Sequence, residues 1–205
     1  MTPEFETLVA LVADLGDGVV IAHGVGPVVA ARHFDRGHVR SPAIERSAWS
    51  AAFAEMSALL MLDRIAPHVV EPVLVLKGPE VAACYPTRGQ RQFADVDLLA
   101  ADADALHHRL VDAGFQQPGV DAAPRHHHLP ALVSPGLDAV VEIHAAVGTY
   151  RWMRPPSASE LVERSAPSRC HPAFRRPDDA DHAVLLQAHA VSTRATLDLR
   201  DALDV

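Results

Sequence analysis

Two pairs of polar side chains interrupt apolar segments of this chain at the same spacing. Asp95 and Asp97 are separated by one residue, and Glu142 and His144 repeat that spacing about 45 positions later. A β-strand alternates its side chains with a period of two, so each pair is expected on one face of its strand. Carboxylates are ligands that Mg²⁺ prefers, so Asp95 and Asp97 are candidate ligands for a divalent cation, and Glu142 adds a third acid.

A lysine and an arginine lie near the first acidic pair. Lys77 is the only lysine among the 18 Lys and Arg residues, and it ends an apolar run directly before Gly78. Residues 79–85 can form a helix, and the unpaired N–H groups at a helix N-terminus favour an anion. Arg91, four positions before Asp95, is a second cation in this region. The acids and cations of the segment 73–100 together predict a combined metal and phosphate site.

Each of these residues also has a simpler interpretation. A lone acidic pair on a strand often lies at a solvated edge or turn, and Lys77 with Gly78 could simply end a strand. Glu142 taken alone fits a surface acid, and His144 fits a core histidine with satisfied hydrogen bonds. The combination favours a metal site, because buried carboxylates need a cation or a hydrogen-bond donor.

Three consecutive histidines at positions 126–128 invite a zinc proposal. Successive strand residues point to opposite faces, so adjacent histidines do not readily converge on one ion, and no H-x-E or C-x-x-C sequence accompanies them. We interpret them as surface histidines, with His126 and His128 at the edge of an active-site pocket as the alternative. The acidic residues at 178–182 are interpreted as a helix start.

Helical periodicity dominates the first third of the chain. Residues 4–15 fit a short amphipathic helix, whereas residues 18–34 fit either a second helix or a strand and turn. Ser41 and Pro42 predict the start of a long helix that ends before Pro67. The apolar stripe of that helix is predicted to pack across the core, and it consists of Trp49, Phe53, Met56, Leu60 and Ile65.

The rest of the chain is predicted to contain strands first and helices later. Residues 69–76 and 92–100 are typical of buried strands, and a helix is expected at 102–114. Three further segments suggest a hairpin, at 116–119, 126–133 and 137–147. Helices are expected at about 159–165, 178–190 and 193–203. The last one reaches the chain end without a cap, which suggests that the chain is short at its C-terminus.

Composition restricts the class of protein. Hydrophobic residues make up 49% and charged residues 21% of the chain, as in an ordinary globular protein. The formal net charge of −8 disfavours binding of extended nucleic acid, which needs a basic face. The two isolated cysteines signal neither a disulfide framework nor a zinc site, and the sequence predicts no signal peptide or membrane span. We expect a soluble cytoplasmic protein, and the arginine bias suggests a bacterial origin.

The motifs LKG, R-x-x-x-D-x-D-L-L and VEIH, in this order, resemble the DNA polymerase beta-like nucleotidyltransferase superfamily. Within it they look like a bacterial family of uncharacterised nucleotidyltransferases. The resemblance covers about residues 73–147 and implies an α/β (α+β) fold, a mixed-sheet core flanked by N-terminal and C-terminal helices. The expected organisation is a helical region at 1–68, a nucleotidyltransferase core at 69–150 and a second helical region at 151–205.

The resemblance also implies roles for the residues. The implied catalytic residues and ligands of Mg²⁺, or of Mn²⁺ as an alternative, are Asp95, Asp97 and Glu142. The implied nucleotide contacts are Lys77, Gly78 and Arg91. His144 would orient the acceptor or support the metal ligands from behind. The superfamily has a Gly-Ser pair on the loop after the first strand; Gly78, with Lys77 before it, matches the glycine, and the missing serine is a departure from the pattern.

The implied reaction moves a nucleoside monophosphate from a nucleoside triphosphate such as ATP to an acceptor, with release of pyrophosphate. Divalent metal ions stabilise the attacking and leaving oxygens of this in-line displacement. The sequence leaves the acceptor open between a small molecule, a protein side chain and an RNA end. The missing serine supports a catalytically inactive nucleotide-binding or partner-binding module as an alternative. A toxin-like nucleotidyltransferase is a further alternative that differs only in its acceptor.

Overall fold

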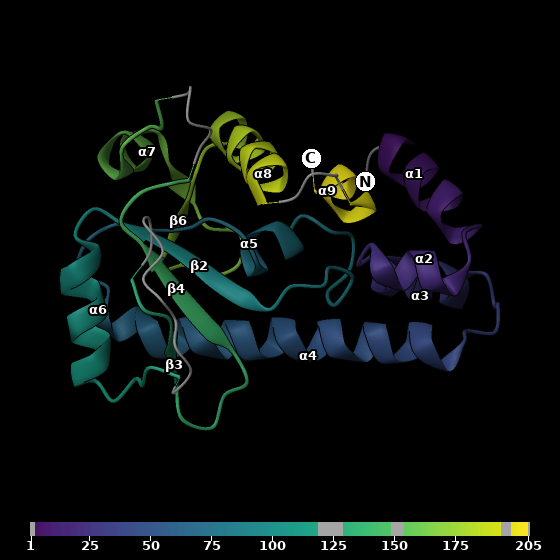
Figure 1. Ribbon diagram of the computed structural model, residues 1–205, viewed down its shortest axis with the longest axis horizontal. Helices are drawn as coiled ribbons and strands as arrows, with labels where there is room; N and C mark the ends of the chain where they lie inside the picture. The colour runs from purple at the N-terminus through teal and green to yellow at the C-terminus, as the bar shows by residue number, and fades with distance from the viewer. Residues whose placement is uncertain (1–2, 119–128, 149–153, 194–197, 205) are drawn as a thin grey trace.

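The computed structural model describes residues 3–118, 129–148, 154–193 and 198–204, and in these residues one mixed sheet forms the centre of the protein (Figure 1). Its six strands are ordered β3-β4-β2-β1-β6-β5. They are β1 (Val73–Val75), β2 (Asp95–Ala100), β3 (Leu132–Val133), β4 (Val140–His144), β5 (Ala166–Pro167) and β6 (Arg175–Arg176). β2 is antiparallel to β1 and parallel to β4. The mixed sheet and its flanking helices confirm the predicted fold class.

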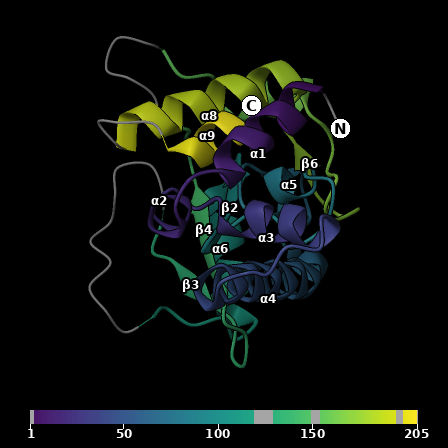
Figure 2. The same cartoon turned by 90° about the vertical axis from the view of Figure 1, so that its right-hand side faces the viewer.

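Helices cover both faces of the sheet. They are α1 (Pro3–Ala13), α2 (Asp17–Ala22), α3 (Gly26–Asp35), α4 (Pro42–Ile65), α5 (Pro79–Ala82), α6 (Ala103–Asp112), α7 (Ala158–Arg164), α8 (Asp179–Thr193) and α9 (Leu199–Leu203). A short 3-10 helix, η1 (Ala66–His68), follows α4. One face packs against α4 and α6 and the other against α7 and α8, so the strands lie between α4 and α8 (Figures 1 and 2).

Alternate residues of β2 point to these two faces. Val96 and Leu98 are buried in the core that includes α4 and α6, whereas Leu99 is buried with residues of α7 and α8. Alternation therefore places Asp95 and Asp97 on the α8 side of the sheet. The buried apolar side chains of β2 hold the strand in the centre of the sheet. The two acids interrupt only the face of β2 that is turned toward α8.

The long helix α4 begins where the sequence predicts, because the Ser41 side chain accepts a hydrogen bond from the Ile44 N–H at 3.3 Å. The prediction for its apolar stripe is wrong for four of five residues. Ile65 is buried, but the exposed members are Trp49 at 77%, Phe53 at 50%, Met56 at 51% and Leu60 at 44%. The buried face instead carries Ile44, Ala51, Ala58, Met61 and Leu62. Both sides of α4 are apolar, so helical spacing alone does not identify the side that meets the sheet.

The N-terminal segment that sequence reasoning left open is helical, with α2 and α3 joined at Gly24. Gly24 has φ +66, a value that favours glycine over other residues. These helices form a second core with α1, with Val81 and Tyr85 near α5, and with Leu203 of α9. As a result α1 and α9 lie side by side (Figures 1 and 2).

The predicted hairpin is confirmed, because β3 pairs antiparallel with β4 across the turn at Pro135 and Gly136. The histidines at 126–128 lie outside the described residues. Sequence reasoning did not predict β5 and β6, whose two residues each are too few to show a period. Among the described residues, no helix has the length and apolar character needed to cross a membrane.

Candidate metal site and adjoining pocket

The parallel register of β2 and β4 brings the two polar pairs together. Asp97 is the partner of Glu142 in this register, and Leu99 is the partner of His144. Because both strands alternate in phase, Asp97, Glu142 and His144 emerge on the same face. One potential ligand atom from each of these three residues lies within 4.8 Å of the others, which is close enough for one cation to contact all three.

Asp97 is the buried centre of this group, with an exposed fraction of 0%. Its Oδ1 lies 3.0 Å from Nε2 of His144 and 3.0 Å from Nζ of Lys77. Its Oδ2 is buried and has no hydrogen-bond partner among the residues that the structure describes. Nε2 of His144 is also 3.9 Å from Oε2 of Glu142. Burying a carboxylate oxygen without a hydrogen-bond partner costs free energy, so a cation bound at Oδ2 would stabilise the buried carboxylate.

Asp95 lies on the same face but outside that three-residue group. Burial raises the pKa of the Asp95 carboxyl, and the negative charge of Asp97 raises it further. For Asp97, burial alone would also raise the pKa, but hydrogen bonds from His144 and Lys77 and the charge of Lys77 outweigh it and lower the pKa overall. Neighbouring carboxyls whose pKa values are shifted in opposite directions are frequent in functional sites.

Gly78 determines how closely the β1 end approaches β2. It has φ +57 and ψ −116, and a Cβ at this position would lie 2.5 Å from the backbone oxygen of Asp95. Both the conformation and the close approach require glycine. The following helix α5 is a single turn and shorter than the predicted helix at 79–85, so a helix dipole contributes little here. The predicted phosphate contacts of this segment therefore depend on Lys77 and backbone groups rather than on a helix dipole.

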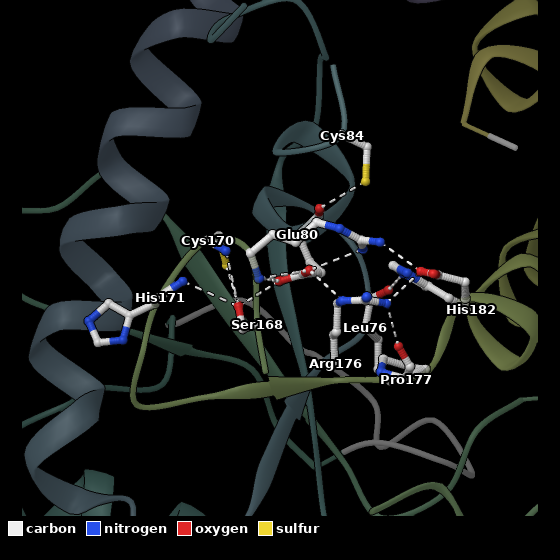
Figure 3. A network of polar contacts seen from close by, with 11 residues as sticks. Leu76, Glu80, Cys84, Ser168, Cys170, His171, Arg176, Pro177 and His182 are labelled. Atoms are coloured by element: carbon white, nitrogen blue, oxygen red, sulfur yellow. Dashed lines mark hydrogen bonds and ion pairs between the residues drawn. The ribbon is translucent and has the colours of Figure 1, made fainter. Parts of the chain in front are cut away.

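The residue before Lys77 is held from two sides. The Leu76 N–H donates to the backbone oxygen of Asp97 at 2.9 Å, and the Leu76 oxygen lies 2.6 Å from Nε2 of His182 on α8 (Figure 3). A carbonyl oxygen only accepts, so His182 carries its proton on Nε2. Burial lowers the pKa of His182, which favours this neutral form. These two hydrogen bonds orient the backbone from which the Lys77 side chain extends.

A second polar network holds α5 (Figure 3). Glu80 is completely buried, and its carboxylate accepts hydrogen bonds from the Ser168 hydroxyl at 2.5 Å and the Arg169 N–H at 3.1 Å. Nη1 of Arg169 and Nε of Arg176 lie 3.5 and 3.7 Å from Oε1. Because Glu80 follows Gly78 by two residues, this network anchors the Lys77-Gly78 turn to the segment around β5 and β6.

Arg91 lies beside the site but is engaged elsewhere. Its Nε and Nη2 donate to the carboxylate of Asp204 at 2.8 and 2.7 Å, and the Tyr85 hydroxyl donates to the same carboxylate at 2.7 Å. Nη1 of Arg91 is buried, and no described residue forms a hydrogen bond with it. The fork of Arg91 thus holds the end of α9 with two nitrogens and leaves the third for another acceptor.

A cavity of about 240 Å³ adjoins the acids and contains the predicted nucleotide contacts. It is lined by charged and polar residues that include Lys77, Gly78, Arg91, Asp95, His189, Arg200 and Asp204. Sequence reasoning did not identify the last three as site residues. The seven-residue spacing of His182 and His189 on α8 is a weak signal that could have identified one of them, because it places both on one helix face.

The residues present fit a divalent cation. The unpartnered oxygen of Asp97 and the adjacent Glu142 offer hard oxygen ligands, which suit Mg²⁺ or Mn²⁺. Ionised Asp97 only accepts hydrogen bonds, so Nε2 of His144 carries a proton in the observed arrangement. His144 can support the carboxylate as a donor, or bind a metal through Nε2 in the tautomer that carries the proton on Nδ1.

A mixed sheet with helices on both faces and a carboxylate cluster across two parallel strands is consistent with a nucleotidyltransferase-like α+β protein. The chain belongs to the family described as uncharacterised nucleotidyltransferase, whose family model matches residues 18–205. It matches no curated protein and no solved structure. Family membership supports a transferase that acts on nucleotides.

Proposed function

We propose that this protein is a metal-dependent nucleotidyltransferase that moves a nucleoside monophosphate from a nucleoside triphosphate to an acceptor and releases pyrophosphate. The observation that carries the proposal is the group of Asp97, Glu142 and His144, in which one buried Asp97 oxygen has no hydrogen-bond partner in the described part of the chain. The adjoining cavity, with Lys77, Arg91 and Arg200 in its lining, supports a phosphate-bearing substrate. Membership of the nucleotidyltransferase family supports nucleotide as the substrate class.

The acids hold the metal in this proposal. Asp97 and Glu142 supply oxygen ligands, with Asp95 on the same face as a further ligand. When bound, a divalent ion neutralises charge on the phosphates and on the attacking oxygen. Glu142 is the more exposed member of the pair, with a side-chain exposure of 24%, so its carboxylate is placed to accept a proton from an acceptor hydroxyl.

The cations hold the triphosphate. Lys77 and the free Nη1 of Arg91 neutralise phosphate oxygens, and Gly78 lets the chain approach without a side chain. His144 keeps Asp97 oriented through their 3.0 Å hydrogen bond. Positioning and charge neutralisation supply most of the catalysis in phosphoryl transfer, and these residues supply both.

The experiment supplies each α-labelled nucleoside triphosphate with Mg²⁺ or Mn²⁺, follows transfer of the label, and measures pyrophosphate release separately with a pyrophosphatase-coupled phosphate assay. We expect release with at least one triphosphate, and its loss in Asp97→Asn. The matched control is Asp112→Asn, which removes an exposed carboxylate at the end of α6 on the opposite side of the sheet. Label found on a small molecule, a protein or an RNA in a cell extract identifies the acceptor class and distinguishes the toxin-like alternative.

The missing serine keeps a binding module without turnover as the second candidate. Metal-dependent triphosphate binding that requires Asp97, with no pyrophosphate release under any condition, would support that module. Absence of both binding and release with every triphosphate and both metals would contradict the proposal and its alternative together. Titration calorimetry measures the binding, and the pyrophosphatase-coupled assay measures the release.

A further inference from the structure

We infer that the Lys77 ammonium is a displaceable counter-ion, which neutralises Asp97 in the metal-free protein and moves to the nucleotide phosphates when metal binds. The inference rests on the proposed function and adds a consequence to it. Metal and nucleotide bind cooperatively, because each removes an obstacle to the other. Without nucleotide, the affinity of the site for metal is therefore low.

The contact at Asp97 supports this inference. Nζ of Lys77 lies 3.0 Å from Oδ1 of Asp97, whose side chain is 1% exposed, while the lysine side chain is 20% exposed. The other contact to this carboxylate is His144. A buried carboxylate requires a cation, and in the described residues Lys77 is the cation that contacts Asp97. The carboxylate expected to bind metal is therefore already neutralised by the protein.

Lys77 can leave this position at small cost. Its second contact is a long one, 3.4 Å to Nε2 of His189, and an ammonium has only donors, so His189 accepts. Lys77 also lines the cavity beside Gly78 and Arg91, where phosphates are proposed to bind. A lysine carries a compact charge on a flexible four-carbon side chain, so its ammonium can move. A bidentate arginine contact, such as that of Arg91 with Asp204, instead fixes the orientation of both partners.

Two cations at one carboxylate repel each other. A divalent ion binds a carboxylate oxygen at about 2.0 to 2.1 Å, so its approach to Asp97 opposes the ammonium at 3.0 Å. Phosphate oxygens in the adjoining cavity offer the ammonium an alternative partner. Linkage is reciprocal, so a nucleotide that attracts Lys77 strengthens metal binding by the same factor by which metal strengthens nucleotide binding.

The first experiment titrates Mn²⁺ into the wild type and Lys77→Met, with and without a nonhydrolysable triphosphate analogue, and measures free Mn²⁺ by electron paramagnetic resonance. We expect Lys77→Met to bind Mn²⁺ on the order of tenfold more tightly than the wild type without nucleotide, and to lose most of the nucleotide-dependent increase. Arg46→Met, which removes an exposed cation on α4, should behave as wild type. Equal or weaker Mn²⁺ binding by Lys77→Met would overturn the inference.

The second experiment needs no variant, because the chain has one lysine. Labelling with ¹³C,¹⁵N-lysine gives a single lysine spin system in nuclear magnetic resonance spectra, and it reports Lys77 alone. We expect a large shift of its ε and ζ signals on adding Mg²⁺ with the nucleotide analogue, and a small one with Mg²⁺ alone. Unchanged signals in the ternary mixture, with metal binding shown separately, overturn the inference but leave the proposed function intact. Absence of Asp97-dependent metal binding in the wild type contradicts the proposed function itself.

Discussion

Glu80 and Asp97 are both completely buried carboxylates, but their surroundings differ. Glu80 accepts hydrogen bonds on both oxygens and has Arg169 and Arg176 within 3.7 Å. Asp97 has its side-chain contacts on Oδ1, while Oδ2 has no hydrogen-bond partner among the described residues, and the charges of Asp97 and Glu142 raise the pKa of the neighbouring Asp95. Both oxygens of Glu80 therefore have donors, whereas only one oxygen of Asp97 has them in the described part of the chain.

This difference separates a structural acid from a candidate functional one. Native proteins satisfy nearly all buried polar atoms, so an exception needs an explanation such as an ion. Neither burial nor charge distinguishes Glu80 from Asp97, because both are equally buried acids. The distinction lies in the number of donors around each carboxylate, and it predicts opposite responses to the same chemical change.

The largest expected effect is on activity in Asp97→Asn. Loss of a metal ligand removes several kcal/mol of transition-state stabilisation, so pyrophosphate release should fall on the order of 10³-fold. The amide keeps the size of the side chain and an acceptor oxygen for His144, and Lys77, which loses its partner charge, is partly exposed, so the free energy of unfolding should fall by only about 1 kcal/mol. Steady-state kinetics and urea unfolding measure the two quantities. A large loss of stability would mean that Asp97 is a structural acid like Glu80.

Glu80→Gln should show the reverse pattern. Neutralising one partner of a buried charge network leaves Arg169 and Arg176 without their acid, which typically costs about 3 kcal/mol or more of folding stability. Mn²⁺ binding should persist in the folded fraction, because the acids of β2 and β4 are unchanged. Urea unfolding and Mn²⁺ titration test this pair of outcomes. A Glu80→Gln protein with wild-type stability and no Mn²⁺ affinity would assign Glu80 to the site instead.

Sequence reasoning placed the two polar pairs better than it placed the core-facing side of α4. The two-residue spacings in β2 and β4 are a property of the strands themselves, so the pairs could be placed on one face before the register was known. The register that sets Asp97 beside Glu142 depends on two segments that are far apart in the sequence, and the resemblance supplied that connection. The roles of these residues remain predictions for the experiments above.

Other features depend on tertiary packing, which the spacing of apolar residues along the sequence does not encode. The stripe of Trp49 and Phe53 has helical spacing, yet the sheet packs on the smaller side chains of α4, such as Ala51 and Ala58. Arg91 was predicted as a nucleotide contact, and its sequence position four residues before Asp95 placed it near the acids. Its bidentate contact with Asp204 joins residues 113 positions apart, which sequence spacing does not reveal. His189 and Arg200 enter the cavity from helices whose placement the sequence does not specify.

Gly78→Ala tests the turn that brings the Glu80 network and the Asp97 site together. The new Cβ would lie 2.5 Å from the Asp95 oxygen at a positive φ of +57, so we expect a loss of about 2 kcal/mol in folding stability. Gly114→Ala is the matched control, since Gly114 has φ +95 with no atom within 4 Å of a Cβ. It should lose about 1 kcal/mol less, because it has the strain without the clash. Equal losses in urea unfolding would mean that the close approach to Asp95 is unimportant.

The smallest effect is the pH dependence of Asp95→Asn, measured by thermal unfolding in EDTA between pH 7 and about pH 4. The folded-state pKa of Asp95 lies above the ordinary value of 3.8, so at pH 7 its charged form destabilises the fold, and this cost disappears as pH falls through that raised pKa. Asp95→Asn should therefore be more stable than wild type at pH 7, with the difference shrinking toward pH 4. Asp97 has the opposite sign: its lowered pKa contributes stability above about 3.8 that is lost only at lower pH. Parallel stability curves for the two proteins would show that Asp95 does not carry the unfavourable charge of the acidic cluster.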